Sequence, residues 1–263
     1  MNDFRDAFYA DYLDFKPDWL GEPAPGFAAY FAKIPLLADL PTGSRVLEIG
    51  FGDGQLLRWC KTLGHHVTGV EIVPALVSRA GEMGIDCLPG PLDASSLGDQ
   101  KFDVIVAFDV LEHMSFEEIA AFFENSKNNL TPRGQYLLRF PNGASPFAYA
   151  YQASDITHKS ILSLGIMKQF ATRTGLTVTG TLQPRPYPRG MKDKMQRWLG
   201  YRLQDLIEWV LTRAYYGGKA HLEPNLLVTL GNPASRVSND VGIDDANAQS
   251  DCNVVLSDAN GLR

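Results

Sequence analysis

The sequence predicts an α/β fold built on an open, mostly parallel sheet with helices on both faces. Strand and helix patterns alternate along residues 41–142, which implies parallel strands joined by helical crossovers. Residues 101–109 include a nearly all-apolar strand, typical of a strand buried on both faces. The segment VLEIGFGDG, 46–54, runs from an apolar strand into a turn with three glycines at alternate positions.

Composition indicates one ordinary globular domain with additions. The 263 residues are 45% hydrophobic and 21% charged, and a chain of this length can bury one sizeable core. The net charge of −6 argues against general nucleic-acid binding. Three cysteines without metal-like spacing (Cys60, Cys87 and Cys252) indicate a reducing compartment. Since the N-terminal segment is acidic and no run of 18 apolar residues exists, we expect a cytoplasmic protein.

The predicted elements follow one another through a domain spanning residues 41–232. An N-terminal helical cap, 1–40, is interrupted by the motif GEPAPG. The following segments are predicted in order: strand 44–49, helix 55–64, strand 66–73, helix 74–84, strand 85–89, strand 102–109, helix 116–130, turn 131–134, strand 135–142, a helix ending at Gly175, and strands 176–182 and 225–231. Glycines end the helices and Pro74 begins one. Residues 233–263 lack aromatic residues and dense apolar patterning, which predicts a disordered tail.

The glycine turn and the acids after the next strands suggest a nucleotide site. The turn has the pattern E-x-G-x-G-x-G from Glu48 to Gly54, one position different from the dinucleotide pattern G-x-G-x-x-G. Glu71 ends the second strand, where a carboxylate can accept two hydrogen bonds from a ribose diol. Asp93, after the third strand, can accept from an exocyclic amine while the Ala94 amide faces a ring nitrogen. A surface acid or an ordinary glycine-rich turn is the alternative for each feature alone.

Together these segments resemble the class I S-adenosylmethionine-dependent methyltransferases. The resemblance covers residues 40–142 and the two late strands. It implies a Rossmann-like, mostly parallel seven-stranded sheet with an antiparallel C-terminal hairpin strand, and S-adenosylmethionine as the cofactor. The implied cofactor-binding residues are Glu48, Gly50, Gly52, Gly54, Glu71, Ile72, Asp93, Ala94, Phe108 and Asp109. Asp53 departs from the small or hydroxylic residues frequent at that position of the family.

Methylation of a hydroxyl group requires a base at the carboxyl edge of the sheet. His158, in the segment SDITHKS, is the first candidate, and Asp155 lies three residues before it, where it can orient the imidazole. His113 follows the fourth strand in AFDVLEHM and is the second candidate. A capping or packing role is the alternative for both histidines. Because no Asp, Glu or His residues have metal-ligand spacing along the chain, we expect no metal.

A second resemblance is to bacterial methyltransferases that accompany surface-polysaccharide and lipopolysaccharide synthesis. It is carried by Asn142–Phe147, Asp155–His158, the helix ending at Gly175 and Pro224–Leu227. It implies a sugar hydroxyl of a glycan or glycan precursor as the acceptor. Two alternatives stay open, because a fold does not specify its substrate. One is O- or C-methylation of a small aromatic or quinone-like metabolite, and the other is a cofactor-binding scaffold without catalysis.

The insertion at 185–219 is basic and amphipathic. It carries eight basic and three acidic residues, a net charge of +5, which leaves −11 for the rest of the chain. Apolar residues recur on one face of a predicted helix from Trp198 to Ala214. Three roles are open: a lid or core helix, a dimer contact, and a peripheral contact of residues 197–214 with the inner face of the membrane.

Overall fold

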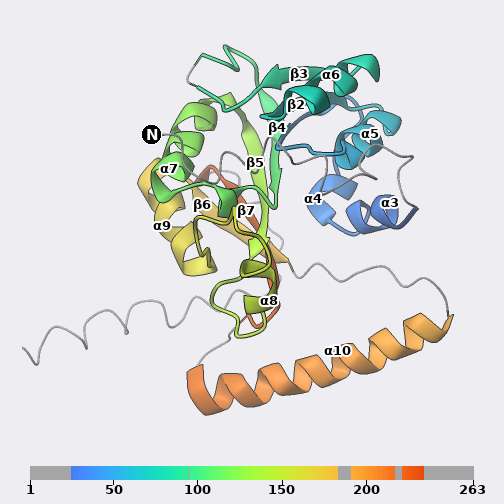
Figure 1. Ribbon diagram of the computed structural model, residues 1–263, viewed down its shortest axis with the longest axis vertical. Coiled ribbons are helices and arrows are strands. Elements are labelled where there is room, and N and C mark those ends of the chain that lie inside the picture. The colour runs from blue at the N-terminus through green and yellow to red at the C-terminus, as the bar shows by residue number, and fades with distance from the viewer. Residues whose placement is uncertain (1–24, 94, 183–190, 217–220, 234–263) are drawn as a thin grey trace, which may run out of the picture.

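One seven-stranded sheet forms the centre of the protein, in the order β3-β2-β1-β4-β5-β7-β6 (Figure 1). The computed structural model describes residues 25–93, 95–182, 191–216 and 221–233. The strands are β1 (Arg45–Ile49), β2 (His66–Glu71), β3 (Asp86–Pro89), β4 (Phe102–Phe108), β5 (Leu130–Pro141), β6 (Thr177–Leu182) and β7 (Asn225–Gly231). Strands β1 to β5 pair in parallel, and β7 runs antiparallel to both β5 and β6. This confirms the predicted fold.

The helices begin and end close to the predicted signals. They are α3 (Pro25–Phe31), α4 (Pro35–Ala38), α5 (Gln55–Thr62), α6 (Pro74–Glu82), α7 (Phe116–Ser126), α8 (Tyr149–Gln152), α9 (Leu164–Thr174) and α10 (Met191–Leu211), with short turns η1 (Leu111–His113), η2 (Lys127–Asn129) and η3 (Thr212–Tyr216). Ser115 begins α7 with a capping box that uses Glu118. Gly175 ends α9 in the left-handed conformation, φ 76°.

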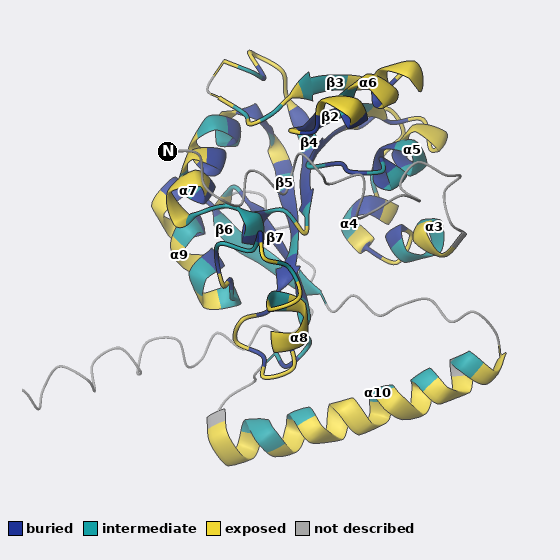
Figure 2. Ribbon diagram, in the orientation of Figure 1, coloured by how far each residue is buried: buried dark blue, intermediate teal, exposed yellow. Residues whose placement is uncertain are grey.

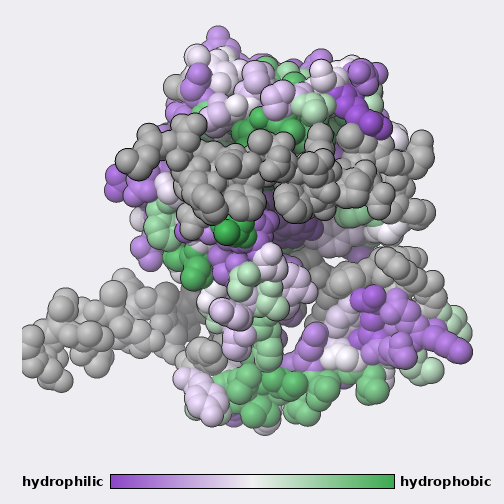
Figure 3. All heavy atoms as spheres, viewed as in Figure 1, coloured by the Kyte–Doolittle hydropathy of each residue, from purple (hydrophilic) through white to green (hydrophobic). Residues whose placement is uncertain are grey.

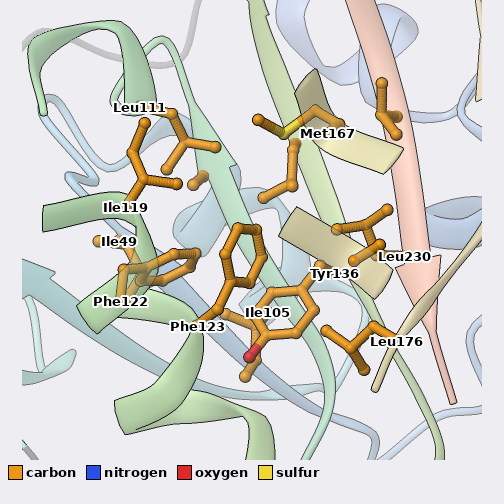
Figure 4. Packing of buried hydrophobic residues seen from close by; sticks show 14 of the residues in the cluster. Ile49, Ile105, Leu111, Ile119, Phe122, Phe123, Tyr136, Met167, Leu176 and Leu230 are labelled. Atoms are coloured by element: carbon orange, nitrogen blue, oxygen red, sulfur yellow. The ribbon is translucent and has the colours of Figure 1, made fainter. Parts of the chain in front are cut away.

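Alternation along the strands divides the core between the two faces of the sheet. Val46, Val104 and Leu137 pack with residues of α3, α4 and α5. The residues next to them along the strands, Leu47, Ile105 and Tyr136, point to the opposite face and pack with residues of α7 and α9. On that second face Tyr136 is fully buried, and its hydroxyl lies 2.8 Å from Ser126 Oγ (Figure 4). The strands β1, β4, β5 and β7 are accordingly mostly buried, whereas the outer strands β3 and β6 have no fully buried residue (Figure 2).

Several predicted boundaries differ from the structure. The predicted helix 116–130 ends at Ser126, and Leu130 already belongs to β5. The predicted turn 131–134 is part of β5, although regular pairing with β4 begins only at Gln135, after a register shift. Helix α10 starts at Met191, seven residues before Trp198. The predictions for residues 1–24, for the tail from 234 onward and for 185–190 and 217–219 lie outside the described residues. No helix in the described ranges is long and apolar enough to cross a membrane.

Candidate functional site

The predicted site residues gather at the carboxyl edge of the sheet, where the strand order reverses between β1 and β4. The turn after β1 holds Gly50, Gly52 and Gly54 at φ 63°, 52° and 68°, a conformation that favours glycine. A Cβ on Gly50 would lie 2.6 Å from Val110 Cγ2, in the loop after β4. Gly50 therefore lets the β1 turn pass close to the β4 loop, and all three glycines allow the left-handed backbone of the turn.

The Glu71 side chain, at the end of β2, forms a hydrogen bond with this turn. Its Oε2 accepts a hydrogen bond from Gly52 N at 3.1 Å, and its Oε1 accepts from Ile72 N at 2.8 Å and Val73 N at 3.1 Å. The buried carboxylate therefore orders the glycine turn, a structural role beyond the ribose contact that the sequence predicts. Ile72 beside it is exposed.

Asp93 lies further along the same edge, in an exposed turn. Its Oδ1 accepts from Ser95 N and Ser95 Oγ, both at 2.8 Å, and from Ser96 Oγ at 3.0 Å. Hydrogen bonds from Ser95 lower the pKa of Asp93 below its ordinary value. The carboxylate accepts these hydrogen bonds within its own turn. Its contact with adenine stays a prediction. Ala94 lies outside the described residues.

Glu48 lies beneath the glycine turn as a buried carboxyl group. Burial raises its pKa well above the ordinary value, and the negative charge of Asp53 adds to the rise. Among the described residues its Oε2 has no hydrogen-bond partner. An unpaired acceptor is costly in the interior, so Glu48 is suited to a ligand that brings a positive charge or a donor.

Asp109 is held at the end of β4 by a residue that the sequence analysis missed. Its carboxylate accepts from Arg139 Nε at 2.9 Å and also pairs with Arg139 Nη2. The Arg139 guanidinium lies over the rings of Phe108, 4.7 Å from the centroid, and Tyr30, and donates to the Tyr30 hydroxyl at 3.1 Å. Asp109 itself has φ 55°, unusual for a residue with a side chain. Within a strand pattern Arg139 carries no signal, because only the parallel pairing of β4 with β5 brings it to Asp109.

The three predicted catalytic residues lie close together, and Asp155 makes its hydrogen bonds to Thr157, so the pairing of Asp155 with His158 stays a prediction. Asp155 Oδ1 accepts from Thr157 N at 2.8 Å and from Thr157 Oγ1 at 2.6 Å. Because Thr157 uses its proton there, its Oγ1 accepts from His113 Nδ1 at 2.8 Å. Asp155 therefore orients His113, through Thr157. Burial disfavours the charged form of Asp155, yet the hydrogen bonds from Thr157 bring its pKa below the ordinary value.

A backbone carbonyl orients His158 instead. Its Nδ1 lies 3.0 Å from Gln152 O, and a carbonyl can only accept, so Nδ1 carries a proton and Nε2 is the nitrogen that can act as a base. The His113 and His158 rings lie 4.7 Å apart, edge to face. Both imidazoles thus hold an Nδ1 proton against an oxygen atom and have Nε2 as the basic nitrogen.

Glu112 completes this cluster from its buried position in η1. Burial raises the pKa of its carboxyl group to about 8, and the charge of Asp109 adds to the rise. Ligand atoms of Glu112, His113 and His158 lie within 4.8 Å of one another and could hold a metal ion. The expectation of no metal depended on spacing along the chain, and that reason fails because two distant segments build the cluster.

The loop that carries His158 is held down by backbone contacts. Lys159 N and Ser160 N donate to Glu112 O at 2.7 and 3.1 Å, and Ser160 Oγ donates to Met114 O at 2.6 Å. At the start of the same loop, Asn142 Nδ2 donates to His221 O and Glu223 O. Several motif residues behind the polysaccharide resemblance thus hold the loop against the segment before β7.

Comparison with known proteins agrees with this architecture. A family model described as a methyltransferase domain matches residues 25–181, more than half of the chain. A ubiquinone biosynthesis O-methyltransferase of Chelativorans sp. is 32% identical over 126 residues, covering 46% of this chain and 49% of the relative. A relative of the same description from Methylobacterium sp. is 26% identical over 113 residues, covering 41% and 45%. The chain spans about half the length of the curated relatives it matches.

Solved structures match over a larger share of the chain. Magnesium protoporphyrin IX methyltransferase from Synechocystis, solved with S-adenosylhomocysteine, aligns with a TM-score of 0.56 at 15% identity, covering 87% of this chain and 97% of that one. A Burkholderia thailandensis N1-methyltransferase, also with S-adenosylhomocysteine, aligns with a TM-score of 0.53 at 17% identity, covering 86% and 85%. At these identities the likeness shows the fold.

The site fits the cofactor that this fold accommodates. The crowded approach at Gly50 and the unpartnered buried oxygen of Glu48 suit a ligand that lies against backbone and carries a positive charge. Membership of the subgroup that accompanies surface-polysaccharide synthesis stays a prediction. From the match over residues 25–181 and the seven-stranded sheet, we conclude that the chain belongs to the class I S-adenosylmethionine-dependent methyltransferases.

Proposed function

We propose that this protein methylates a hydroxyl oxygen and that His158 accepts the hydroxyl proton. The observation that carries the proposal is the fixed tautomer of His158, whose Nδ1 is held by Gln152 O at 3.0 Å. His158 belongs to the cluster after β4, at the edge where this fold binds its cofactor. A positioned imidazole is the commonest general base in proteins.

The other residues of the site would bind the cofactor and orient the catalytic side chains. S-adenosylmethionine supplies, when bound, a methyl group on a positively charged sulfur atom. Glu71 and the glycines shape the turn that would hold it, and Glu48 offers a buried carboxyl group, with one unpartnered oxygen, near which its ammonium group would lie. Arg139 fixes the Asp109 carboxylate at the edge, where it would line the approach of the acceptor. The hydroxyl proton goes to His158 Nε2, and Thr157 holds the neighbouring His113.

A small aromatic or quinone-like hydroxyl is the acceptor class that we favour. The curated relatives are described as ubiquinone biosynthesis O-methyltransferases. The loop before and around His158 exposes several large apolar side chains, namely Phe147, Tyr149, Tyr151, Ile156 and Ile161. Such a surface suits a flat apolar acceptor, because its burial removes apolar area from water.

A sugar hydroxyl is the second candidate acceptor. It follows from the polysaccharide resemblance, and the exposed rings of Tyr149 and Tyr151 could also pack on the apolar face of a sugar. The motif residues Asn142 and Ser145 do not favour it, since they bond to backbone oxygens of the segment before β7. A catalytically silent scaffold remains the third alternative.

Label transfer distinguishes these candidates. The protein would be incubated with methyl-labelled S-adenosylmethionine and an extract of the source organism, which is then separated into organic-soluble small molecules, water-soluble metabolites and glycans. We expect label in the organic-soluble fraction. Label in the glycan fraction would select the sugar acceptor. If no fraction gains label although S-adenosylhomocysteine still binds, the result would favour a cofactor-binding scaffold without catalysis.

The cluster of Glu112, His113 and His158 supports a second form of the same chemistry. Two imidazoles that each hold Nδ1 against oxygen, beside a carboxylate, form a common pattern of ligands for a divalent cation. Such an ion would lower the pKa of a bound hydroxyl. In the metal-free form that the sequence predicts, turnover survives dialysis against a chelator. Loss of turnover that Mg²⁺ or Zn²⁺ restores would reassign His158 from base to ligand.

The remaining predictions concern organisation and location. We propose a cap at 1–40, a methyltransferase domain at 41–232 with an insertion at 185–219, and a tail at 233–263. We also propose a cytoplasmic protein that contacts the membrane surface through residues 197–214. The exposed apolar side chains of α10 support the membrane contact.

A further inference from the structure

Helix α10 exposes its whole apolar face. Stepping 100° per residue places its large apolar side chains, except the half-buried Leu211 at its end, within one half of the helix circumference. Every member of this set is exposed: Met191, Met195, Trp198, Leu199, Leu203, Leu206, Ile207, Trp209 and Val210. Trp198 is 58% exposed and Leu199 is 64% exposed, which is far more than a helix packed on a core would show.

The polar face of α10 is the one turned toward the rest of the protein. Glu208 Oε1 accepts from Leu222 N, just before β7, at 3.4 Å. Asp193 and Arg197, which pair at 2.8 Å, and Tyr201 are half-buried on this same side. Hydrophobic residues gather along the edge of α10 that points away from the sheet (Figure 3). A helix that covers a core or closes a cleft turns its apolar face toward the protein. Helix α10 turns its polar face toward the protein instead.

The charges within the exposed apolar half are basic. Lys192 and Arg202 fall inside it, whereas all three acids of α10, Asp193, Asp205 and Glu208, fall outside it. The Arg202 guanidinium lies 5.7 Å from the centroid of the Trp198 ring, and that of Arg213, in η3, lies 5.3 Å from that of Trp209. Tryptophan beside arginine along an apolar face is typical of helices that lie in the headgroup region of a bilayer.

We propose that α10 docks flat on an anionic lipid bilayer, with Trp198 and Trp209 in the headgroup region. The basic residues match anionic headgroups, and the acidic remainder of the chain, at −11, keeps the rest of the protein off that surface. The helix is too polar to cross the bilayer. Its 21 residues give it a length of about 31 Å along the surface. This inference rests on the membrane contact proposed above, for which it names the lipid class and the docking residues, and it does not depend on any acceptor.

Vesicle sedimentation tests the docking without cofactor or acceptor. The full chain would be pelleted with vesicles of phosphatidylcholine alone and with vesicles holding about 30% phosphatidylglycerol, which resemble an anionic leaflet. We expect binding to the anionic vesicles only, and weakening at high salt. Arg202→Gln with Arg213→Gln should weaken binding roughly tenfold or more, given about fivefold for each charge near the surface. Trp198→Ala with Trp209→Ala should abolish it.

Matched control variants distinguish a loss of docking through α10 from a general change in net charge and from a loss of folding. Lys168→Gln with Arg173→Gln removes two exposed charges from α9 and should leave binding unchanged. Gln204→Ala, on the polar side of α10, should also leave it unchanged. Brominated lipids should quench the fluorescence of Trp198 and Trp209 in a Trp19→Phe, Trp59→Phe background.

Three outcomes would overturn the proposal. The first is no pelleting of the wild-type chain with either vesicle. The second is equal loss of binding in the α9 control. The third is a concentration-dependent dimer in sedimentation velocity that Trp198→Ala with Trp209→Ala converts to monomer, with no vesicle binding; this would assign the face to a second copy of the chain. All variants must keep S-adenosylhomocysteine binding, which reports on the fold of the domain.

Discussion

The imidazole rings of His113 and His158 lie edge to face, with their centroids 4.7 Å apart. They come from two distant segments, one after β4 and one in the loop after β5. Each ring holds its Nδ1 proton against a different oxygen, Thr157 Oγ1 for His113 and Gln152 O for His158. Two imidazoles that each hold Nδ1 against an oxygen therefore share one end of the site.

His158→Ala should abolish most turnover and spare cofactor binding. A general base contributes about 10²–10⁴-fold, so we expect the rate of label transfer to fall by that factor, with the affinity for S-adenosylhomocysteine unchanged in calorimetry. His66→Ala, an exposed histidine at the opposite end of the sheet, is the control. Near-normal turnover in His158→Ala would refute the base assignment.

Thr157→Val should show that Asp155 acts through Thr157 on His113. Valine keeps the shape but removes the hydroxyl between Asp155 and His113 Nδ1. We expect kcat to fall about five- to tenfold, the size of one lost hydrogen bond, with a changed pH profile. Thr157→Ser should restore both the rate and the profile, and its failure to do so would indicate a packing role.

Glu71→Ala should weaken cofactor binding. It removes the acceptor for Gly52 N, Ile72 N and Val73 N, so the glycine turn loses its order. We expect the affinity for S-adenosylhomocysteine to fall roughly tenfold or more, the effect of about 1.4 kcal/mol. The exposed Glu82→Ala in α6 is the control. Unchanged affinity in Glu71→Ala would contradict the assigned role.

Glu48→Gln should raise the stability of the cofactor-free protein while lowering its affinity for cofactor. A carboxyl group whose folded-state pKa is raised stabilises the fold only while protonated, so its contribution declines as the pH rises above the ordinary value of 4.5. The Tm advantage of Glu48→Gln over wild type should therefore grow as the pH rises above 4.5. The comparison uses thermal melts with Glu82→Gln as control, and an advantage independent of pH would be inconsistent with a raised pKa.

Gly50→Ala should destabilise the protein through two effects. The residue has φ 63°, and its Cβ would lie 2.6 Å from Val110 Cγ2. The left-handed conformation alone costs about 1–2 kcal/mol, and the contact adds to it, so we expect Tm to fall by about 5 °C or more. Gly26→Ala, in α3 with open space around its Cβ, should have little effect. Equal Tm values for the two variants would contradict this account.

Much of the site was predictable because neighbours in sequence build it. The glycine turn, Glu71 and Asp109 follow directly on strands, and parallel strands end at a common edge. The contacts of Asp155 were not predictable, since three residues of spacing do not say which histidine it reaches. Arg139 carried no signal of function for a similar reason, and the place of Glu112 after the fourth strand did not show that it is buried beside both histidines. Their roles depend on strand pairing and burial.

The sequence by itself determined the alternation of strands and helices, the buried strands, the glycine turn and the amphipathic helix, because each depends on local periodicity and conformational preference. Only the tertiary structure decided that Thr157 links Asp155 to His113, that Glu112 joins the two histidines, and that α10 turns its polar face inward. Those relationships join segments far apart in the chain. Packing and hydrogen bonding, which no local pattern encodes, bring them together.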